Sequence, residues 1–296
     1  MLKFKKSKLE QIKTFIRNLE EDGVAIEKSD KEKIIKLIKP TIGIDVMLNE
    51  NNSILVGKSK IGGKPDVPQN FVWPRANNKP MLFCAQYNLS ELTKFDKEDV
   101  LPNQGFFYIF LSLDEEYEEF NGLDQDYKFI YSASENVQRA EFPNDLEEDR
   151  QFDYSPIEYF EFFTIPDLGN YKLSELDKKY HDFNYYVYNP ISEYISEVCD
   201  THPDNYHQLL GEDRAMQLSI PHELAFKELG FEDFKNTQTE NDKIIEVAKS
   251  YDTLLQLYCD DSDLNIYGGY GCFYFMINKE DLKNLNFDNV KMTFQL

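Results

Sequence analysis

The sequence predicts an α+β protein with a duplicated antiparallel β core and an N-terminal helical hairpin. Of its 296 residues, 23 are Phe and 19 are Tyr, which favour strands and bury large areas. Apolar residues recur at helical spacing before residue 45 and again in parts of the second half. Aromatic runs of strand length occupy much of the remaining sequence. Two consecutive runs in the first half resemble two consecutive runs near the C-terminus.

Two amphipathic helices open the chain. Residues 7–20 place apolar side chains on one helical face: Leu9, Ile12, Ile16 and Leu19. Ser29 and Glu32 have capping-box spacing before a second helix that Pro40 ends. We expect this hairpin (residues 1–45) to pack on the main α+β domain (residues 46–296).

The main domain begins with strands separated by glycine- and proline-rich turns. Strands are expected within residues 43–48, 53–63, 79–89, 101–113, 122–132, 252–259, 271–277 and 289–296. The middle is more helical: Asn189 can cap a helix that starts with Pro190, and Pro221 opens another. Residues 240–250 and 278–285 also have helical patterns.

An internal similarity suggests the duplication. Each half has an apolar strand containing a glutamine, Gln86 or Gln256, followed by a Gly-x-Phe-Tyr strand. Tyr108 of the first such strand corresponds to Tyr274 of the second. The glutamines are out of step with the tyrosines, so the connecting loops differ in length. Chance similarity between β-rich segments is the alternative.

The charge excludes several partners. Lys and Arg number 32 and Asp and Glu 54, for a formal net charge of −22. Such a field repels phosphate backbones and anionic membranes, which argues against nucleic-acid and membrane binding. It is compatible either with simple solubility or with electrostatic capture of a basic protein.

Cysteine usage and the N-terminus indicate a cytoplasmic protein. The four cysteines are widely spaced, without the close pairs of a zinc site or the density of a disulfide framework. No apolar run is long enough to span a membrane, and the basic N-terminus lacks the apolar stretch of a signal peptide.

The stretch "LLQLYCDDSDLNIYGGYGCFYFMI" (residues 254–277) contains acids and glycines of the kinds that form metal or phosphate sites. Asp260, Asp261 and Asp263 could bind Mg²⁺ or Ca²⁺, but the spacing of a calcium loop fails at Asn265 and Gly271. The glycines lead into an aromatic strand rather than a helix, so they do not form a phosphate cradle. The stretch therefore predicts a hairpin, and no metal or cofactor is expected.

Catalytic motifs are also lacking. The four histidines have neither zinc-ligand spacing nor a nucleophile motif beside them, and are expected at the surface or at helix caps. Chance carboxylate pairs are inevitable among 54 acids. The sequence thus leans against an enzyme and predicts no catalytic residue.

Polar and aromatic residues inside the apolar motifs are the better binding candidates. A buried glutamine must have its amide partnered, so hydrogen bonding to loop backbone is the structural explanation. The alternative is that several of these residues line one concave surface, since Trp and Arg are favoured at interaction hot spots. The candidates are Trp73, Arg75, Gln86, Tyr108, Gln217, Asp260 and Tyr274.

Six motifs in order resemble the YwqG-like proteins, the bacterial family also known as domain of unknown function 1963. They are "SKIGGKPDVPQNFVWP", "PMLFCAQYNLSEL", "LPNQGFFYIF", "HQLLGEDRAMQ", "LLQLYCDDSD" and "YGGYGCFYFMINKEDLKNLNFDNV". The resemblance covers roughly residues 55–296 and implies an α+β fold with a duplicated β core, a cytoplasmic bacterial setting and no established activity. It also implies immunity-like protein binding for some members. The chain departs from the family pattern at Gly269, where an acidic residue is missing, and after Gly211, where an aromatic residue and a proline are replaced.

These observations favour a non-catalytic protein-binding factor, for which an immunity-like role is one form, with a basic protein as partner. The alternative is a metal-dependent or small-molecule-binding enzyme with its site between the duplicated halves, built from Gln86 and the acids at 260–263.

Overall fold

The computed structural model describes residues 6–20, 25–48, 53–112, 126–202, 207–231, 242–259 and 271–296. Within them, ten strands form one antiparallel sheet. These are β1 (Lys39–Val46), β2 (Lys60–Ile61), β6 (Leu82–Asn88), β7 (Phe106–Leu111), β8 (Tyr127–Ser132), β10 (Ser155–Thr164), β11 (Gln208–Leu209), β12 (Tyr251–Tyr258), β13 (Cys272–Asn278) and β14 (Lys291–Gln295). Two short pairs lie outside the sheet: β3 (Asp66–Val67) with β9 (Gln138–Arg139), and β4 (Arg75–Ala76) with β5 (Lys79–Pro80).

The strand order is symmetric about the central pair β1 and β10. The full order is β14-β13-β12-β11-β1-β10-β2-β6-β7-β8. Each side therefore repeats a two-residue strand followed by a three-stranded meander. The pairing of β6 with β7 shifts register between Phe83 and Ala85, and the pairing of β12 with β13 shifts between Thr253 and Leu255. The duplicated β core is thus visible both in the strand order and in the position of an irregularity.

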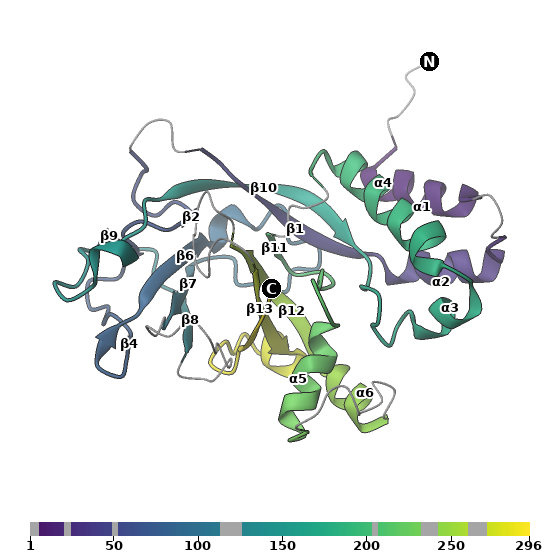
Figure 1. Ribbon diagram of the computed structural model, residues 1–296. Helices are drawn as coiled ribbons and strands as arrows, with labels where there is room; N and C mark the ends of the chain where they lie inside the picture. The colour runs from purple at the N-terminus through teal and green to yellow at the C-terminus, as the bar shows by residue number, and fades with distance from the viewer. Residues whose placement is uncertain are drawn as a thin grey trace, which may run out of the picture.

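The sheet curls until its two outer strands approach each other, so that it resembles a nearly closed barrel (Figure 1). The Tyr127 hydroxyl on β8 donates a hydrogen bond to the carbonyl oxygen of Val290, just before β14, over 2.8 Å. Across the interior, the rings of Phe129 and Phe275 lie 5.8 Å apart. The main buried core consequently combines side chains from both halves.

The outer faces of the two halves are covered in different ways. In the first half, the irregular chain between β2 and β6 places Phe71 and Trp73 on Phe110. In the second half, α5 (Ile220–Glu228) packs Ile220 against Tyr274, and α6 (Asp242–Ala248) packs on α5. Three further helices are short. η1 (Leu89–Glu91) follows β6, η2 (Glu148–Arg150) precedes β10, and α7 (Lys279–Lys283) follows β13.

A helical layer covers the C-terminal end of β10, to the right in Figure 1. It contains α1 (Lys8–Asn18), α2 (Lys28–Leu37), α3 (Ser174–Lys179), the π-helix η3 (Asn184–Tyr188) and α4 (Asn189–Cys199). Asp30 of α2 is only 1% exposed and accepts hydrogen bonds of 2.7 Å from both Lys179 and Tyr180. These bonds, together with Lys33, hold the pKa of Asp30 well below its ordinary value. They attach the N-terminal hairpin to α3.

The expected fold class, including the N-terminal helical hairpin, is confirmed, and two helix starts are corrected. Ser29 is not a cap, because α2 begins at Lys28 with Glu27 as its N-cap residue. Asn189 is not a cap either, because η3 already brings helical backbone into α4. The strand expected over residues 53–63 is reduced to β2, since Gly57, Gly62 and Gly63 turn the chain with positive φ. The division of the chain at residue 45 stays a prediction.

Candidate functional site

Gln86 and Tyr108 form a clamp that holds the loop after β2 against the sheet. The two residues face each other in the register of β6 and β7. The Asp66 backbone N–H donates to Gln86 Oε1 over 2.7 Å, and the Tyr108 hydroxyl donates to the Asp66 carbonyl oxygen over 2.8 Å. The Gln86 amide also donates to the Lys58 carbonyl oxygen over 2.7 Å.

The second half repeats this clamp with different residues. Gln256 faces Tyr274 in the register of β12 and β13. Gln256 Oε1 accepts from the Arg214 backbone N–H over 3.1 Å, and the Tyr274 hydroxyl donates to the Arg214 carbonyl oxygen over 3.1 Å. All four clamp side chains are fully buried. Their polar atoms are used to fix loop backbone, as the structural explanation of the glutamines expects.

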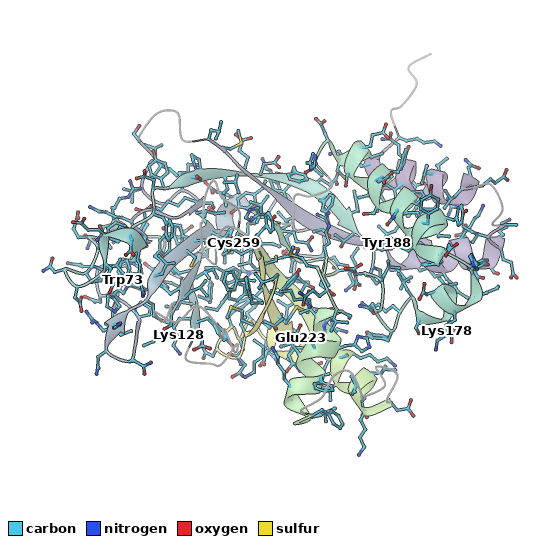
Figure 2. All side chains as sticks on the ribbon, viewed as in Figure 1. Trp73, Lys128, Lys178, Tyr188, Glu223 and Cys259 are labelled. Atoms are coloured by element: carbon cyan, nitrogen blue, oxygen red, sulfur yellow. The ribbon has the colours of Figure 1, made fainter. Side chains whose placement is uncertain are left out.

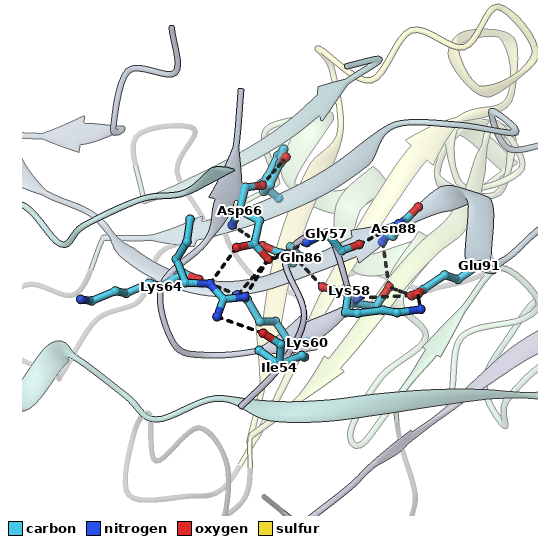
Figure 3. Close-up of polar contacts among 12 residues, drawn as sticks. Ile54, Gly57, Lys58, Lys60, Lys64, Asp66, Gln86, Asn88 and Glu91 are labelled. Carbon is cyan, nitrogen blue, oxygen red and sulfur yellow. Dashed lines mark hydrogen bonds and ion pairs between the residues drawn. The ribbon is translucent and has the colours of Figure 1, made fainter. Parts of the chain in front are cut away.

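Behind the first clamp lies a buried ion cluster centred on Asp66 (Figure 3). Arg139 donates to both carboxylate oxygens of Asp66, over 2.8 and 3.2 Å, and Lys60 Nζ lies 3.3 Å from Oδ2. The backbone N–H of Gly57 and the amide of Gln86 each donate to the same Oδ2 over 3.0 Å. Five donors thus surround one carboxylate.

The cluster shifts the pKa values of its members in ways that follow from burial. Burial lowers the pKa of Lys60 to about 8, although Asp66 opposes this shift. Burial would raise the pKa of Asp66, but the hydrogen bond from Arg139 and the charge of Lys60 outweigh it and lower that pKa. A lysine with this pKa has the basicity of a reactive amine. Only 1% of the Lys60 side chain is exposed, however, so a substrate cannot reach it, and we interpret the cluster as a structural one.

The equivalent positions of the second half carry different charges. Lys60 pairs with Gln86 in register as Gln208 pairs with Gln256. Lys60 donates to the carbonyl oxygen four residues on, at Lys64, and the Gln208 amide likewise donates to the carbonyl oxygen of Glu212 over 2.8 Å. The same loop is therefore held by a cation in one half and by an amide in the other.

In front of the cluster a polar clasp closes the turn after β6 (Figure 3). Ser59 donates from its hydroxyl to Glu91 over 2.6 Å and accepts from the Asn88 backbone N–H over 2.8 Å. Lys58 Nζ donates to the other oxygen of Glu91 over 2.8 Å. The serine hydroxyl is engaged as donor and as acceptor, so this Ser–Glu contact fixes η1 rather than activating a nucleophile. A pocket of about 620 Å³ lies beside the clasp, between η1 and β10.

Trp73 and Arg75 lie at a different place, the end of the molecule that carries β4 and β9, to the left in Figures 1 and 2. We call this surface, formed by residues 64–80 and 134–153, the Trp73 end. The Trp73 indole N–H donates to the Met81 carbonyl oxygen over 2.8 Å, and its ring packs edge-on against Phe142. Arg75 is exposed and forms two hydrogen bonds with Asp145, of 2.8 and 2.9 Å.

The predicted candidates that the structure describes do not lie together on one surface. Gln86 and Tyr108 meet in the first clamp, while Tyr274 belongs to the second. Gln217 is exposed near the C-terminus and donates to the Leu296 carbonyl oxygen over 2.8 Å. Asp260, with the rest of the expected acidic stretch, lies outside the described residues.

Several buried polar residues were not indicated by the sequence. Asp66, Lys60 and Arg139 sit next to residues chosen as candidates, but a Lys and an Asp six residues apart carry no signal of burial. His222, expected at the surface or at a helix cap, lies buried in the first turn of α5, with Nδ1 2.9 Å from the hydroxyl of the N-cap residue Ser219. This Ser–His pair has the atoms of a nucleophile and a base, yet both side chains are buried and out of reach of a substrate.

The described residues hold no group of three or more His, Cys, Asp or Glu side chains suited to a metal ion. The cysteines Cys84, Cys199, Cys259 and Cys272 are all buried and unpaired as disulfides, as small hydrophobic residues would be. In the part of the chain that the structure describes, no helix has the length and apolar character needed to span a membrane.

Comparison with known proteins adds a family. The profile of the domain of unknown function DUF1963 matches residues 59–295, which include both clamps and both halves of the sheet outside β1. None of the curated proteins shows significant sequence similarity to the chain. The chain therefore belongs to the DUF1963 family.

Proposed function

We propose that this chain is a non-catalytic binding protein of the bacterial cytoplasm, and that its partner is a basic protein that docks on the Trp73 end. The observation that carries the proposal is the composition of that surface. Between residues 134 and 153 the sequence contains seven acids and two bases, and all seven acids are exposed. Beside them Val72 has 83% of its surface exposed.

Three of these seven acids form ion pairs within the chain, and the other four have no cationic partner among the described residues. Asp145 pairs with Arg75, Glu141 with Lys64 and Glu147 with Arg150. Among the described residues, no cationic side chain pairs with Glu135, Glu148, Asp149 or Asp153. Unpaired exposed carboxylates steer a basic partner and are inexpensive to desolvate at the rim of an interface.

The surface is also held in place before any partner arrives. The strand pair β3–β9 joins its two segments, and the Trp73 ring is fixed by its hydrogen bond to Met81. The Arg75–Asp145 pair is bidentate, which adds geometric definition. Preorganised loops lose less conformational entropy on binding, which favours affinity.

The non-catalytic part of the proposal rests on how the polar groups are used. The clamps and the Asp66 cluster hold loop backbone, and the Ser59–Glu91 contact holds a turn. The enzyme alternative depends on acids at 260–263, outside the described residues, and gains no support from the groups described.

The experiment is an affinity capture by the purified chain, loaded at low salt and eluted at high salt, with mass spectrometry of the eluate. We expect a basic protein that salt releases, because exposed charge contacts are screened within about 10 Å at 0.1 M salt. Glu148→Lys combined with Asp149→Lys should abolish its capture, and Val72→Ser should weaken it.

The matched control reverses two exposed acids at the other end of the molecule, Glu193→Lys with Glu197→Lys on α4. This variant has the same net charge as the test variant and should keep the partner. Equal loss in both variants would show that net charge alone matters and would reject the Trp73 end as the docking surface. A complex that high salt does not release would reject charge-driven binding.

A further inference from the structure

The pocket between η1 and β10 is lined by equal numbers of acidic and basic side chains, although the chain as a whole is strongly acidic. Its volume is about 620 Å³, enough for a small ligand. Two lysines and two glutamates line it, Lys58, Lys94, Glu91 and Glu158, so its formal charge is zero in a chain of net charge −22. A neutral pocket attracts neither a simple cation nor a simple anion.

Two of these four charges are already satisfied inside the protein. Lys58 pairs with Glu91 at 2.8 Å, and the second oxygen of Glu91 accepts from the Ser59 hydroxyl and the Ser59 backbone N–H. This clasp forms a fixed wall of the pocket.

The other two charged side chains, Lys94 and Glu158, form no ion pair with any described residue. Lys94 Nζ contacts only the face of Phe95, 4.6 Å from the ring centroid, and Glu158 has no ionic or hydrogen-bonding side-chain partner within the described residues. Lys94 and Glu158 are not paired with each other, because their charged atoms are more than 4.0 Å apart. Among the residues that the structure describes, Lys94 and Glu158 are therefore a cation and an anion without ionic partners that line the same pocket.

Apolar groups occupy the space around these charges. Phe95 and Ile157 line the pocket, and the ring of Phe95 packs 6.3 Å from that of Tyr159. β2 pairs with β10 only at Ser155 and Pro156. Beyond these two residues this edge of β10 has no strand partner within the described part of the chain, and the pocket lies there. A ligand here would meet apolar walls and one charge of each sign.

We propose that this pocket binds an apolar zwitterion of the class of free α-amino acids and dipeptides. The ligand's ammonium group lies against Glu158, its carboxylate against Lys94, and its apolar side chain against Phe95 and Ile157. Each charge of the ligand then receives a charge-assisted hydrogen bond, and the neutral ligand leaves the pocket neutral. This site is separate from the Trp73 end, so it stands or falls independently of the proposed protein partner.

The test is a titration of the full chain with L-leucine and with glycyl-L-leucine, followed by calorimetry and by amide chemical shifts. Two capped probes, L-leucinamide and N-acetyl-L-leucine, each remove one ligand charge. We expect saturable millimolar or tighter binding of at least one uncapped probe, and at least tenfold weaker binding of both capped probes. Whether leucine or the dipeptide binds better distinguishes the two sources of this chemistry.

Variants assign the charges to residues. Lys94→Gln should weaken the uncapped probe at least tenfold while leaving L-leucinamide unaffected, because that probe has no carboxylate to lose. Glu158→Gln should do the same with N-acetyl-L-leucine as the unaffected probe. Lys36→Gln, at an exposed lysine of α2 outside the pocket lining, is the matched control and should bind as the wild type does. No saturable binding, or equal affinities in all three variants, would overturn the proposal.

Discussion

Asp213 is a carboxylic acid placed where its charged form is disfavoured. Only 1% of its surface is exposed, and Oδ2 accepts a hydrogen bond of 3.2 Å from the backbone N–H of Ile220, the first residue of α5. Burial raises the pKa of Asp213 to about 7, and the negative charges of Glu212 and Asp167 act in the same direction. The folded state therefore holds a proton that the unfolded chain, with a pKa of about 3.9, has already released at neutral pH.

This shift makes the free energy of unfolding depend on pH. Because the folded state binds the extra proton between about pH 4 and pH 7, the contribution of Asp213 to stability falls as pH rises through that window. The slope approaches about 1.4 kcal/mol per pH unit. Asp213→Asn, which stays neutral, should lose this slope and become more stable relative to the wild type as pH rises.

Urea unfolding of both proteins at several values between pH 4 and pH 8 measures the difference. Asp288→Asn, a substitution at an exposed aspartate, is the control and should run parallel to the wild type. Parallel curves for Asp213→Asn as well would mean that Asp213 is ionised in the folded state throughout this range.

At the scale of elements, the clamps explain how a sheet holds long irregular loops. Gln86 accepts from the buried Asp66 backbone N–H, which would otherwise lack a partner, and it also donates to the part-buried carbonyl oxygen of Lys58. Strand periodicity places Gln86 in β6 but does not indicate what it bonds, because its partners come from a loop 20 to 28 residues away.

Gln86→Leu should therefore destabilise the protein strongly. The substitution keeps the approximate size of the side chain but leaves the buried Asp66 backbone N–H unpaired, at a cost of about 1–3 kcal/mol. Gln217→Leu, on an exposed glutamine, should change the free energy of unfolding by about 0.5 kcal/mol or less. Chemical denaturation compares the two, and equal midpoints would refute the structural role of the clamp.

The N-terminal helices show the same limit of local signals. Helical periodicity finds α1 and α2, but the capping-box pattern at Ser29 and Glu32 misplaces the start of α2. Glu32 instead bonds Arg17 of α1 at 2.8 Å, and Asp30 turns toward α3. Contacts with neighbouring helices thus take the polar groups that the local pattern assigns to a cap.

At the scale of the whole molecule, the two halves share one interior. Phe275 on β13 is fully buried and its ring lies 5.8 Å from Phe129 and 6.2 Å from Tyr127, both on β8 of the other half. The symmetry of the strand order would allow two separate units, but the curled sheet makes each half complete the core of the other.

Phe275→Ala should consequently destabilise both halves together, by about 3–5 kcal/mol. The protein offers a direct reporter, because its single tryptophan, Trp73, lies in the first half while Phe275 lies in the second. Unfolding followed by Trp73 fluorescence and by circular dichroism should shift to the same lower midpoint. An unchanged fluorescence midpoint would show that the halves unfold independently.

The sequence by itself determines the fold class, the N-terminal helices, the principal strands and the existence of two similar halves. These features are encoded locally, in apolar periodicity, glycine turns and aromatic strand composition. The tertiary structure alone decides which polar residues meet. The contacts of Asp66 with Lys60 and Arg139, and the placement of Lys94 and Glu158 on one pocket, depend on segments that loops of variable length bring together. A charge pattern along the chain does not specify distance or burial, and these two quantities determine whether a polar residue supports the fold or remains free to bind.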